Sequence, residues 1–303
     1  MIVSVSELTH RYGERTALDK ISFEVPEGRI FALLGPNGGG KSTLFRILST
    51  VMAPSAGRAS VAGFDVTTEP AQVRRLIGVV FQSQSLDRKL TVRENLRAQG
   101  YFFGLCGASL RARIGEVTTR LHLSSRIDDI VETLSGGLRR RVEIAKALLH
   151  RPRVLLMDEP STGLDPAARR ELWQYISDLR SIENATVLLT THILEEADRA
   201  DELVLLHQGR IVAAGTPSQL KARVGGDVVV LETGDPATLE AGIASRFGVR
   251  ATASGSSLRV EIENGHRFIA EVVEAFPGAI QSVALHKPTL EDVFLDETGV
   301  SIC

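Results

Sequence analysis

The stretch that decides the fold is Gly35-Pro36-Asn37-Gly38-Gly39-Gly40-Lys41-Ser42-Thr43. It follows Arg29–Leu34 (RIFALL), which predicts a buried strand, and precedes the helical pattern of Leu44–Leu48. Glycines let backbone N–H groups curl around phosphates, and the following helix adds the positive end of its dipole. Lys41 supplies a charge for the β- and γ-phosphates, and the Ser42 hydroxyl is a ligand for Mg²⁺. An ordinary glycine-rich turn is the alternative, but the flanking strand and helix favour a phosphate-binding loop.

A second polar cluster follows another apolar run. Val154–Met157 predicts a buried strand, and Asp158, Glu159 and Pro160 come directly after it. Ligands of open α/β sheets bind beyond the carboxyl ends of the strands, so these carboxylates are expected beside the phosphate-binding loop. Asp158 would hold Mg²⁺ through water, and Glu159 would accept the proton of an attacking water. Alone, the run indicates a strand that ends in a polar turn; with the loop, it predicts a nucleoside triphosphatase.

The surrounding pattern predicts an α/β fold. Short apolar strands alternate with helical patterns through the first two-thirds of the chain, which is typical of a mainly parallel sheet covered by helices. Ile2–Val5 and Ile21–Val25 alternate polar and apolar residues and predict an antiparallel β subdomain. From about residue 92 to residue 149 the pattern is helical, which predicts an inserted helical subdomain.

Two domains are expected within the 303 residues. Gly225 and Gly226 indicate a boundary, so a nucleotide-binding domain at residues 1–220 is followed by an accessory domain at residues 227–303. In the second domain, strand-like runs alternate with helical patterns, which predicts a small α+β fold. These runs are Val228–Leu231, Leu258–Ile262 and Ile280–Leu285.

Charge and hydropathy exclude several classes of protein. The chain has 35 Lys and Arg against 37 Asp and Glu, a net charge of −2, which gives no support for nucleic-acid binding. The basic run Arg139–Arg141 is interpreted as a solvated helix face. No apolar run approaches the roughly 20 residues that cross a bilayer, and the first residues do not resemble a secretory signal. A cytosolic protein is expected.

One further motif carries a family resemblance. Leu134–Leu148 (LSGGLRRRVEIAKAL) resembles the signature sequence of ABC transporter ATP-binding subunits. The resemblance implies that Ser135, Gly136 and Gly137, at a helix N-terminus, bind the γ-phosphate of an ATP held by the opposite subunit of a head-to-tail dimer. Two residues depart from the family pattern: Leu138, where Gln is frequent, and Gly39, where Ala or Ser is frequent. Neither departure removes a phosphate ligand. The phosphate-binding loop that contains Gly39 donates through its backbone, and Ser135, Gly136 and Gly137 of the signature are intact.

Other residues of the family pattern follow in order over about residues 1–220. The resemblance assigns Gln82 to the loop that senses Mg²⁺ and the attacking water, and Ser161–Asp165 to the D-loop. It assigns His192 to the switch that contacts the γ-phosphate and Tyr12 to stacking on adenine. Taken singly, a His or Gln at such a place is usually structural, and Tyr12 would equally pack against the neighbouring strand. Their order around both phosphate motifs favours the functional interpretation.

The C-terminal segment narrows the resemblance to one branch. Pro288–Leu295 and Gln84–Leu96 resemble the daunorubicin-resistance-like ATP-binding subunits of ABC exporters. By pattern alone, Leu290, Val293 and Phe294 form the apolar face of a terminal helix. The domain is expected to be a dimer contact, with a regulatory domain or a stabilising cap as alternatives.

The resemblance implies a P-loop NTPase fold that binds ATP and Mg²⁺ and hydrolyses ATP. Its implied partners are a second copy of the chain and a separate transmembrane permease, docked near Ser83–Phe103 at the cytoplasmic face of the membrane. The implied cargo is an exported drug, lipid or polysaccharide. The predicted catalytic residues are Lys41, Gln82, Glu159 and His192, and the predicted metal ligands are Ser42, Gln82 and Asp158. The predicted nucleotide-binding residues are Tyr12, Gly35, Pro36, Asn37, Gly38, Gly39, Gly40, Lys41, Ser42, Thr43, Gln82, Ser135, Gly136, Gly137 and His192.

Three other uses of the same chemistry are less consistent with the sequence. Ribosome-associated relatives usually carry two cassettes in one chain, and one is present here. Chromosome-associated relatives insert a long coiled coil between the two nucleotide motifs, but the chain between Lys41 and Asp158 has no such heptad run. An importer subunit would share every catalytic motif and is disfavoured only by the C-terminal segment. A heterodimer is the alternative to the simpler homodimer.

Overall fold

The computed structural model describes the backbone of residues 1–300 and, except at 182, 183 and 254, their side chains. The chain divides into two compact units, Met1–Ala214 and Gly215–Cys303. We expected this division between residues 220 and 227. It lies earlier because α8 (Pro217–Val224) packs against α11 (Leu290–Thr298), so that both helices belong to the second unit.

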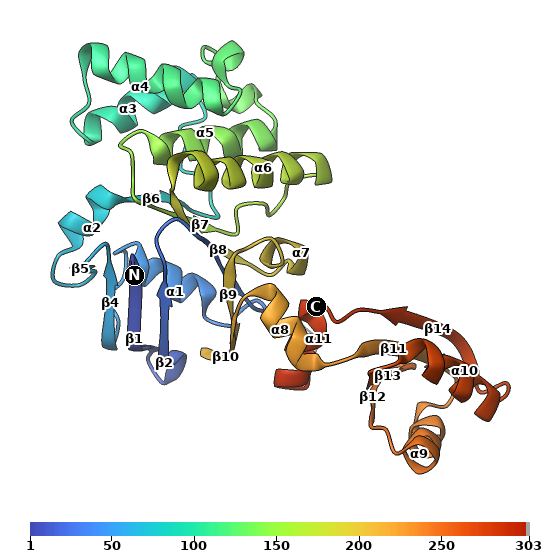
Figure 1. The fold of residues 1–303 in the computed structure, drawn as a ribbon. Helices are drawn as coiled ribbons and strands as arrows, with labels where there is room; N and C mark the ends of the chain where they lie inside the picture. Colours follow the sequence, from blue (N-terminus) through green and yellow to red (C-terminus); the bar gives the residue numbers. More distant parts are fainter. Residues whose placement is uncertain (301–303) are drawn as a thin grey trace. The chain divides into compact units, whose positions relative to one another are not determined.

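A six-stranded sheet forms the centre of the first unit (Figure 1). In spatial order its strands are β10 (Arg210–Gly215), β9 (Glu202–His207), β3 (Ile30–Leu34), β8 (Thr186–Thr191), β7 (Val154–Asp158) and β6 (Ile77–Val80). The five strands from β9 to β6 run parallel, and β3, β7 and β8 are buried along their whole length. Parallel sheets covered on both faces need such continuous apolar runs. Because these strands are parallel, their carboxyl ends lie at one edge.

A second, antiparallel sheet belongs to the same unit. Its strands, in spatial order, are β2 (Arg15–Val25), β1 (Val3–Tyr12), β4 (Ala56–Val61) and β5 (Phe64–Asp65). The predicted antiparallel subdomain is therefore present, but β1 and β2 are longer than their apolar runs. They pair as far as Tyr12 and Arg15, through register shifts that begin after Val5. The strands are longer because their backbones continue to pair beyond the buried side chains. A pattern of apolar residues cannot predict this extra length.

Local residue chemistry explains where the helices that flank the sheets begin. Pro166 occupies the first turn of α6, where its missing N–H is not needed, and Asp165 caps the helix. The Asp165 carboxylate accepts the backbone N–H groups of Ala167 and Ala168 at 2.9 and 3.0 Å. The helices that flank the two sheets are α1 (Lys41–Leu48), α2 (Pro70–Leu76), α6 (Pro166–Glu183) and α7 (Leu194–Ala197).

The segment predicted to be helical contains α3 (Val92–Phe102), α4 (Gly107–Arg120) and α5 (Gly136–Leu148). Figure 1 shows these three helices gathered on one side of the first unit, away from the antiparallel sheet. One prediction for this segment is wrong. Arg140 does not lie on a solvated face: it is 6% exposed and points into the interior of the unit. Its guanidinium reaches backbone carbonyls beyond α5, which satisfies a buried charge that would otherwise be costly.

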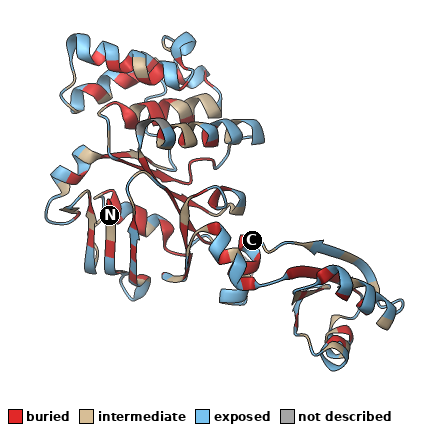
Figure 2. Cartoon of the chain, in the orientation of Figure 1, coloured by how far each residue is buried: buried red, intermediate tan, exposed pale blue. Residues whose placement is uncertain are grey.

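One hydrophobic core joins the elements of the first unit. It includes Ile21 and Val61 of the antiparallel sheet, Leu33 of the central sheet, and Phe45 of α1. Figure 2 shows buried residues concentrated in the strands and on the inner faces of the helices. Burying apolar area at this scale is the main favourable term in folding. Within residues 1–300, no helix is long and apolar enough to cross a membrane.

The second unit has its own core, as expected of a small α+β domain. In spatial order its sheet consists of β12 (Ala251–Ser254), β13 (Ser257–Ile262), β11 (Asp227–Thr233) and β14 (Ile280–His286), all antiparallel. Two helices, α9 (Pro236–Phe247) and α10 (Gly265–Ala275), bury Ile243 and Phe268 against it. In α11, Phe294 is fully buried.

We predict that Phe294→Ala destabilises the second unit by about 3–5 kcal/mol, because removing a buried aromatic ring leaves a cavity. Calorimetry of the full chain would show a lower unfolding temperature for the transition of this unit. Phe294→Leu, which refills most of the space, should cost less. Equal unfolding temperatures for Phe294→Ala and the unsubstituted chain would contradict the packing described here.

Candidate functional site

The loop at residues 35–40 joins β3 to α1 and requires glycine at some of its positions. Gly40 has φ 109° at the N-cap of α1, and a Cβ atom there would lie 2.7 Å from the Ala17 carbonyl oxygen. Gly38 also has positive φ, at 80°. A side chain at Gly40 would therefore be strained and would displace the hairpin between β1 and β2. The loop leads into the N-terminus of α1, where backbone N–H groups favour an anion.

Lys41, the first residue of α1, is held over this loop. Its side chain is 4% exposed, and Nζ donates to the carbonyl oxygens of Gly35 at 2.7 Å and Pro36 at 3.0 Å. Burial lowers the pKa of Lys41, and the nearby carboxylates of Glu159 and Asp158 oppose that change. A partly desolvated ammonium ion is thus placed where it can bind phosphate oxygens.

Two carboxylates lie at the end of β7, where Thr190 of β8 contacts both residues. Asp158 and Glu159 are 7% and 8% exposed. Thr190 Oγ1 donates to Asp158 Oδ1 at 2.6 Å and accepts the backbone N–H of Glu159 at 2.9 Å. Burial raises the pKa of Asp158, while the bond from Thr190 favours its ionised form. Glu159 adopts φ 44°, a left-handed conformation that costs a residue with a side chain about 1–3 kcal/mol.

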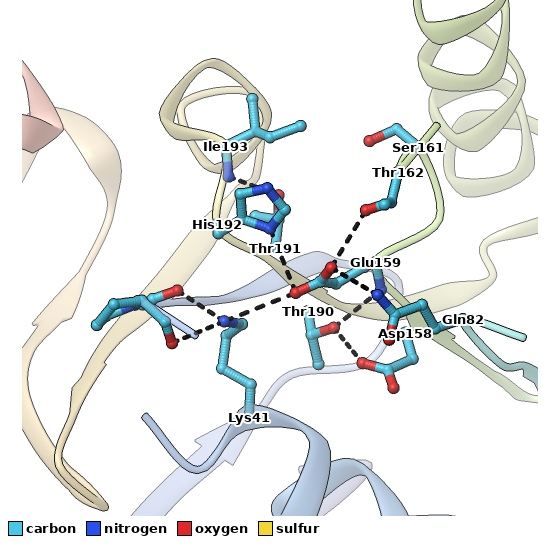
Figure 3. A network of polar contacts seen from close by, with 12 residues as sticks. Lys41, Gln82, Asp158, Glu159, Ser161, Thr162, Thr190, Thr191, His192 and Ile193 are labelled. Carbon is cyan, nitrogen blue, oxygen red and sulfur yellow. Dashed lines mark hydrogen bonds and ion pairs between the residues drawn. The ribbon is translucent and has the colours of Figure 1, made fainter. Parts of the chain in front are cut away.

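The Glu159 carboxylate is the centre of a polar network (Figure 3). Its Oε2 accepts from Gln82 Nε2 and from Thr162 Oγ1, both at 3.2 Å. Its Oε1 lies 3.8 Å from Lys41 Nζ and 3.3 Å from His192 Nδ1. Gln82 follows β6 closely and His192 follows β8 directly, so the edge formed by the parallel strands brings these groups together.

A cavity of about 280 Å³ adjoins this network. Tyr12 lies at its rim, together with Asn37, Ser42 and Thr43 of the phosphate-binding loop and with Glu159. Tyr12 also packs edge-on against the ring of His10 at 4.7 Å, which lies on the same strand, β1, and not on a neighbouring one. Its ring is 44% exposed, and a flat surface remains for stacking.

Sequence reasoning missed three side chains near this site. Arg15 and Arg46 line the cavity, and Thr190 orders both carboxylates. Arg46 could have been predicted from the sequence, because it lies four residues after Ser42 on α1 and therefore on the same helix face. Arg15 is placed by the hairpin that pairs it with Tyr12, which no local pattern reports.

The predicted signature residues lie outside this cavity. Ser135 caps α5, where its Oγ accepts the backbone N–H of Leu138 at 3.3 Å. A Cβ atom added to Gly136 would meet nothing within 4 Å, so the backbone there is open to an approaching group. Within one copy of the chain, Ser135 and Gly136 do not join Lys41 and Glu159 around the cavity.

The oxygen ligands at the site suit Mg²⁺. This ion binds proteins through one or two carboxylates and completes its octahedron with water and substrate phosphates. The residues predicted to hold the ion would offer it the hydroxyl of Ser42, the amide oxygen of Gln82 and the carboxylate of Asp158. Among residues 1–300, no group of three or more His, Cys, Asp or Glu side chains could form an all-protein metal cage. The site therefore fits a metal ion that arrives with a phosphate ligand.

Comparison with known proteins agrees with this arrangement. Residues 18–162 match the ABC transporter family, and residues 215–298 match the C-terminal domain of ATP-binding proteins like DrrA1-3. The chain is 39% identical to the daunorubicin resistance ATP-binding protein DrrA3 of Streptomyces coeruleorubidus, over 98% of this chain and 96% of that protein. It is 40% identical to the Nod factor export ATP-binding protein I of Ralstonia nicotianae, over 98% and 94%.

Solved structures of ABC ATP-binding subunits have a similar fold. The ATP binding subunit of an ABC transporter is 31% identical, with a TM-score of 0.67 over 74% of this chain and 94% of its own. The dimeric post-hydrolysis state of an ATP-binding cassette with bound ADP and Pi is 28% identical, with a TM-score of 0.64 over 71% of this chain and 98% of its own. The predicted fold class, a P-loop NTPase of the ABC type, is confirmed.

We predict that Lys41→Ala weakens ATP binding by about 10- to 100-fold, the range expected for one hydrogen bond to a charged group. Calorimetric titration with ATP measures this directly. Lys89→Ala is the control, because the Lys89 side chain is 81% exposed and pairs with Glu132 instead. Equal ATP affinity in Lys41→Ala and the unsubstituted chain would contradict the assignment of the loop.

Proposed function

This chain belongs to the ATP-binding subunits of ABC transporters, and we propose that it hydrolyses ATP at the cavity around Lys41 and Glu159 to drive a separate membrane permease. The observation that carries this proposal is the network of Figure 3, in which Lys41, Gln82 and His192 converge on the Glu159 carboxylate. That arrangement sets a general base beside a phosphate-binding loop.

Glu159 acts as the general base in this proposal. It accepts one proton of a water molecule while the water oxygen attacks the γ-phosphorus, and the bond to the bridging oxygen of ADP breaks. Gln82 and Thr162 hold Oε2 at 3.2 Å, so the carboxylate has a defined direction. In this proposal His192, whose Nδ1 lies 3.3 Å from Oε1, contacts the γ-phosphate. Positioning and charge stabilisation of this kind account for most of phosphoryl-transfer catalysis.

Ser42 and Asp158 hold Mg²⁺ in this proposal, with the Gln82 amide oxygen beside them. The ion, when bound, neutralises negative charge on the β- and γ-phosphates. Thr190 orients the Asp158 carboxylate through the 2.6 Å bond and favours its ionised form. Lys41 stands across from both carboxylates and offsets part of their charge.

A second copy of the chain completes the site. Ser135 and Gly136 lie at the N-terminus of α5, outside the cavity of their own copy, with an exposed serine and open space above the glycine. A head-to-tail homodimer would set this helix N-terminus against the γ-phosphate bound by the other copy. Loss of the γ-phosphate would remove the ligand that bridges the copies, so the dimer opens after hydrolysis. A dimeric cassette among the similar solved structures supports this proposal.

The permease docks near Ser83–Phe103, at the cytoplasmic face of the membrane. Two aromatic side chains at the end of α3 support this location: Tyr101 is 53% exposed and Phe102 is 86% exposed. Exposed aromatic residues are enriched at protein interfaces. The same segment begins just after Gln82, so in this proposal it connects the active site to the docking surface.

Export is the direction we propose, with a drug, lipid or polysaccharide as cargo. Two relatives of nearly full length support it, one named for daunorubicin resistance and one for Nod factor export. The match of residues 215–298 to the C-terminal domain of the first group adds to this. Cargo recognition belongs to the permease.

We predict that Glu159→Gln lowers steady-state ATP hydrolysis at least about 10²-fold, the low end of what a general base contributes, while ATP binding is retained. Because the γ-phosphate is no longer removed, a dimer should accumulate with ATP. Phosphate release and size-exclusion chromatography measure the two effects. Turnover near that of the unsubstituted chain would exclude Glu159 as the base.

We also predict that Phe102→Asp abolishes co-purification with the permease and leaves basal ATP hydrolysis of the isolated chain unchanged, because a charge replaces an exposed apolar contact far from the reacting groups. Val51→Asp is the matched control: Val51 is 63% exposed but lies between α1 and β4. Equal recovery of the permease with both variants would place the docking surface elsewhere.

A further inference from the structure

Arg140 makes contacts that the hydrolysis scheme does not use. Its Nε donates to the carbonyl oxygen of Pro160 and its Nη1 to that of Phe81, both at 2.7 Å. Its Nη2 lies 3.2 Å from the carbonyl oxygen of Asp158 and 3.3 Å from that of Glu159. One planar guanidinium thus binds four backbone carbonyls from two segments, a task that suits its rigid fork of five donors.

The four carbonyls belong to the backbone that carries the proposed catalytic groups. Phe81 directly precedes Gln82, and the other three residues surround the end of β7. Glu159 has the left-handed φ of 44°, so its backbone must be held by neighbours against relaxation. Thr190 binds its N–H on one side, and Arg140 binds its carbonyl oxygen on the other. The direction of the Glu159 carboxylate follows from this backbone geometry.

The same face of α5 makes a second attachment to the loop after β6. Glu143 and Lys146 follow Arg140 at intervals of three residues, which places them on adjacent turns of one helix face. The Glu143 carboxylate, 2% exposed, accepts the backbone N–H of Ser85 at 2.6 Å and its hydroxyl at 3.0 Å. Lys146 Nζ donates to the Ser85 carbonyl oxygen at 2.8 Å. Residues 81–85 are therefore bound at both ends by the helix that begins with the signature residues.

We propose that Arg140 is a positioning residue for ATP hydrolysis, which fixes the backbone of Glu159 and Gln82 relative to α5. This inference rests on the proposed role of Glu159 as the base. Arg140 contacts none of the residues 35–43, so its removal affects the hydrolytic step and spares nucleotide binding. Misplacing a reacting group by about 1 Å costs about 10²-fold in rate.

Arg140→Ala and Arg140→Lys test the proposal. In Arg140→Ala we expect kcat to fall by about 10- to 100-fold with unchanged ATP affinity, because the carboxylate is misplaced while the phosphate-binding loop is intact. The kcat of Arg140→Lys should lie between those of Arg140→Ala and the unsubstituted chain, since an ammonium ion keeps the charge but cannot span four carbonyls. Arg140→Lys also decides the question if Arg140→Ala does not fold.

Free guanidinium supplies a readout that loss of stability would not produce. Arg140 borders a cavity of about 350 Å³ lined mainly by α5 and α6, so truncating its side chain would extend this space toward the four carbonyls and admit a small cation. Guanidinium ion, added far below denaturing concentrations, should restore part of the lost kcat of Arg140→Ala. It should restore none of the kcat lost in Glu159→Gln.

Arg113 provides the matched control. It is also a buried arginine, 7% exposed, whose guanidinium donates to the backbone carbonyls of Leu148 and Leu149 at the end of α5. Arg113→Ala should lower the unfolding temperature but leave kcat of the folded protein unchanged. Arg140 variants that hydrolyse ATP as fast as the unsubstituted chain, while Glu159→Gln is inactive, would overturn this inference and leave the proposed function standing. An active Glu159→Gln would instead overturn the function.

Discussion

The parallel alignment of β3, β6, β7 and β8 is the constraint on which the site depends. Because the four strands point the same way, their carboxyl ends meet at one edge, and the residue that follows each strand is delivered there. Residues separated by more than a hundred positions, such as Lys41 and Glu159, thereby come within 3.8 Å of each other. The buried apolar runs that hold the strands in register have no chemical role, yet they determine where these residues meet.

The charges at this edge favour the metal–nucleotide complex that we propose as the substrate. Two buried carboxylates, Asp158 and Glu159, face one buried ammonium group, Lys41, in a region of low dielectric. A triphosphate would bring further negative charge close to these two carboxylates, and a Mg²⁺ ion carried with it would offset that charge beside them. Arg140 lies behind the carboxylates and donates hydrogen bonds to their backbone rather than to their side chains.

Much of this could be predicted from the sequence, because each motif joins a strand pattern to a polar residue at its end. Asp158, Glu159 and His192 follow such runs directly, and Lys41 follows one after the glycine-rich loop at residues 35–40. Arg140 was misread, since a run of three arginines indicates solvent until the phase of α5 is known. Its interval of four residues to the buried Ile144 was the available signal. The left-handed φ of Glu159 could not be predicted, because it results from bonds made by distant residues. The unit boundary was placed late, since α8 packs through tertiary contacts with the far end of the chain.

The most direct test is a structure of the Glu159→Gln chain with ATP and Mg²⁺. The γ-phosphate should lie among Lys41, Gln82 and His192, with Mg²⁺ at Ser42 and Asp158, and the N-terminus of α5 from a second copy should close the site. ATP bound elsewhere, for example in the larger cavity beside α5 and α6, or a closed ATP site without a second copy, would contradict this account.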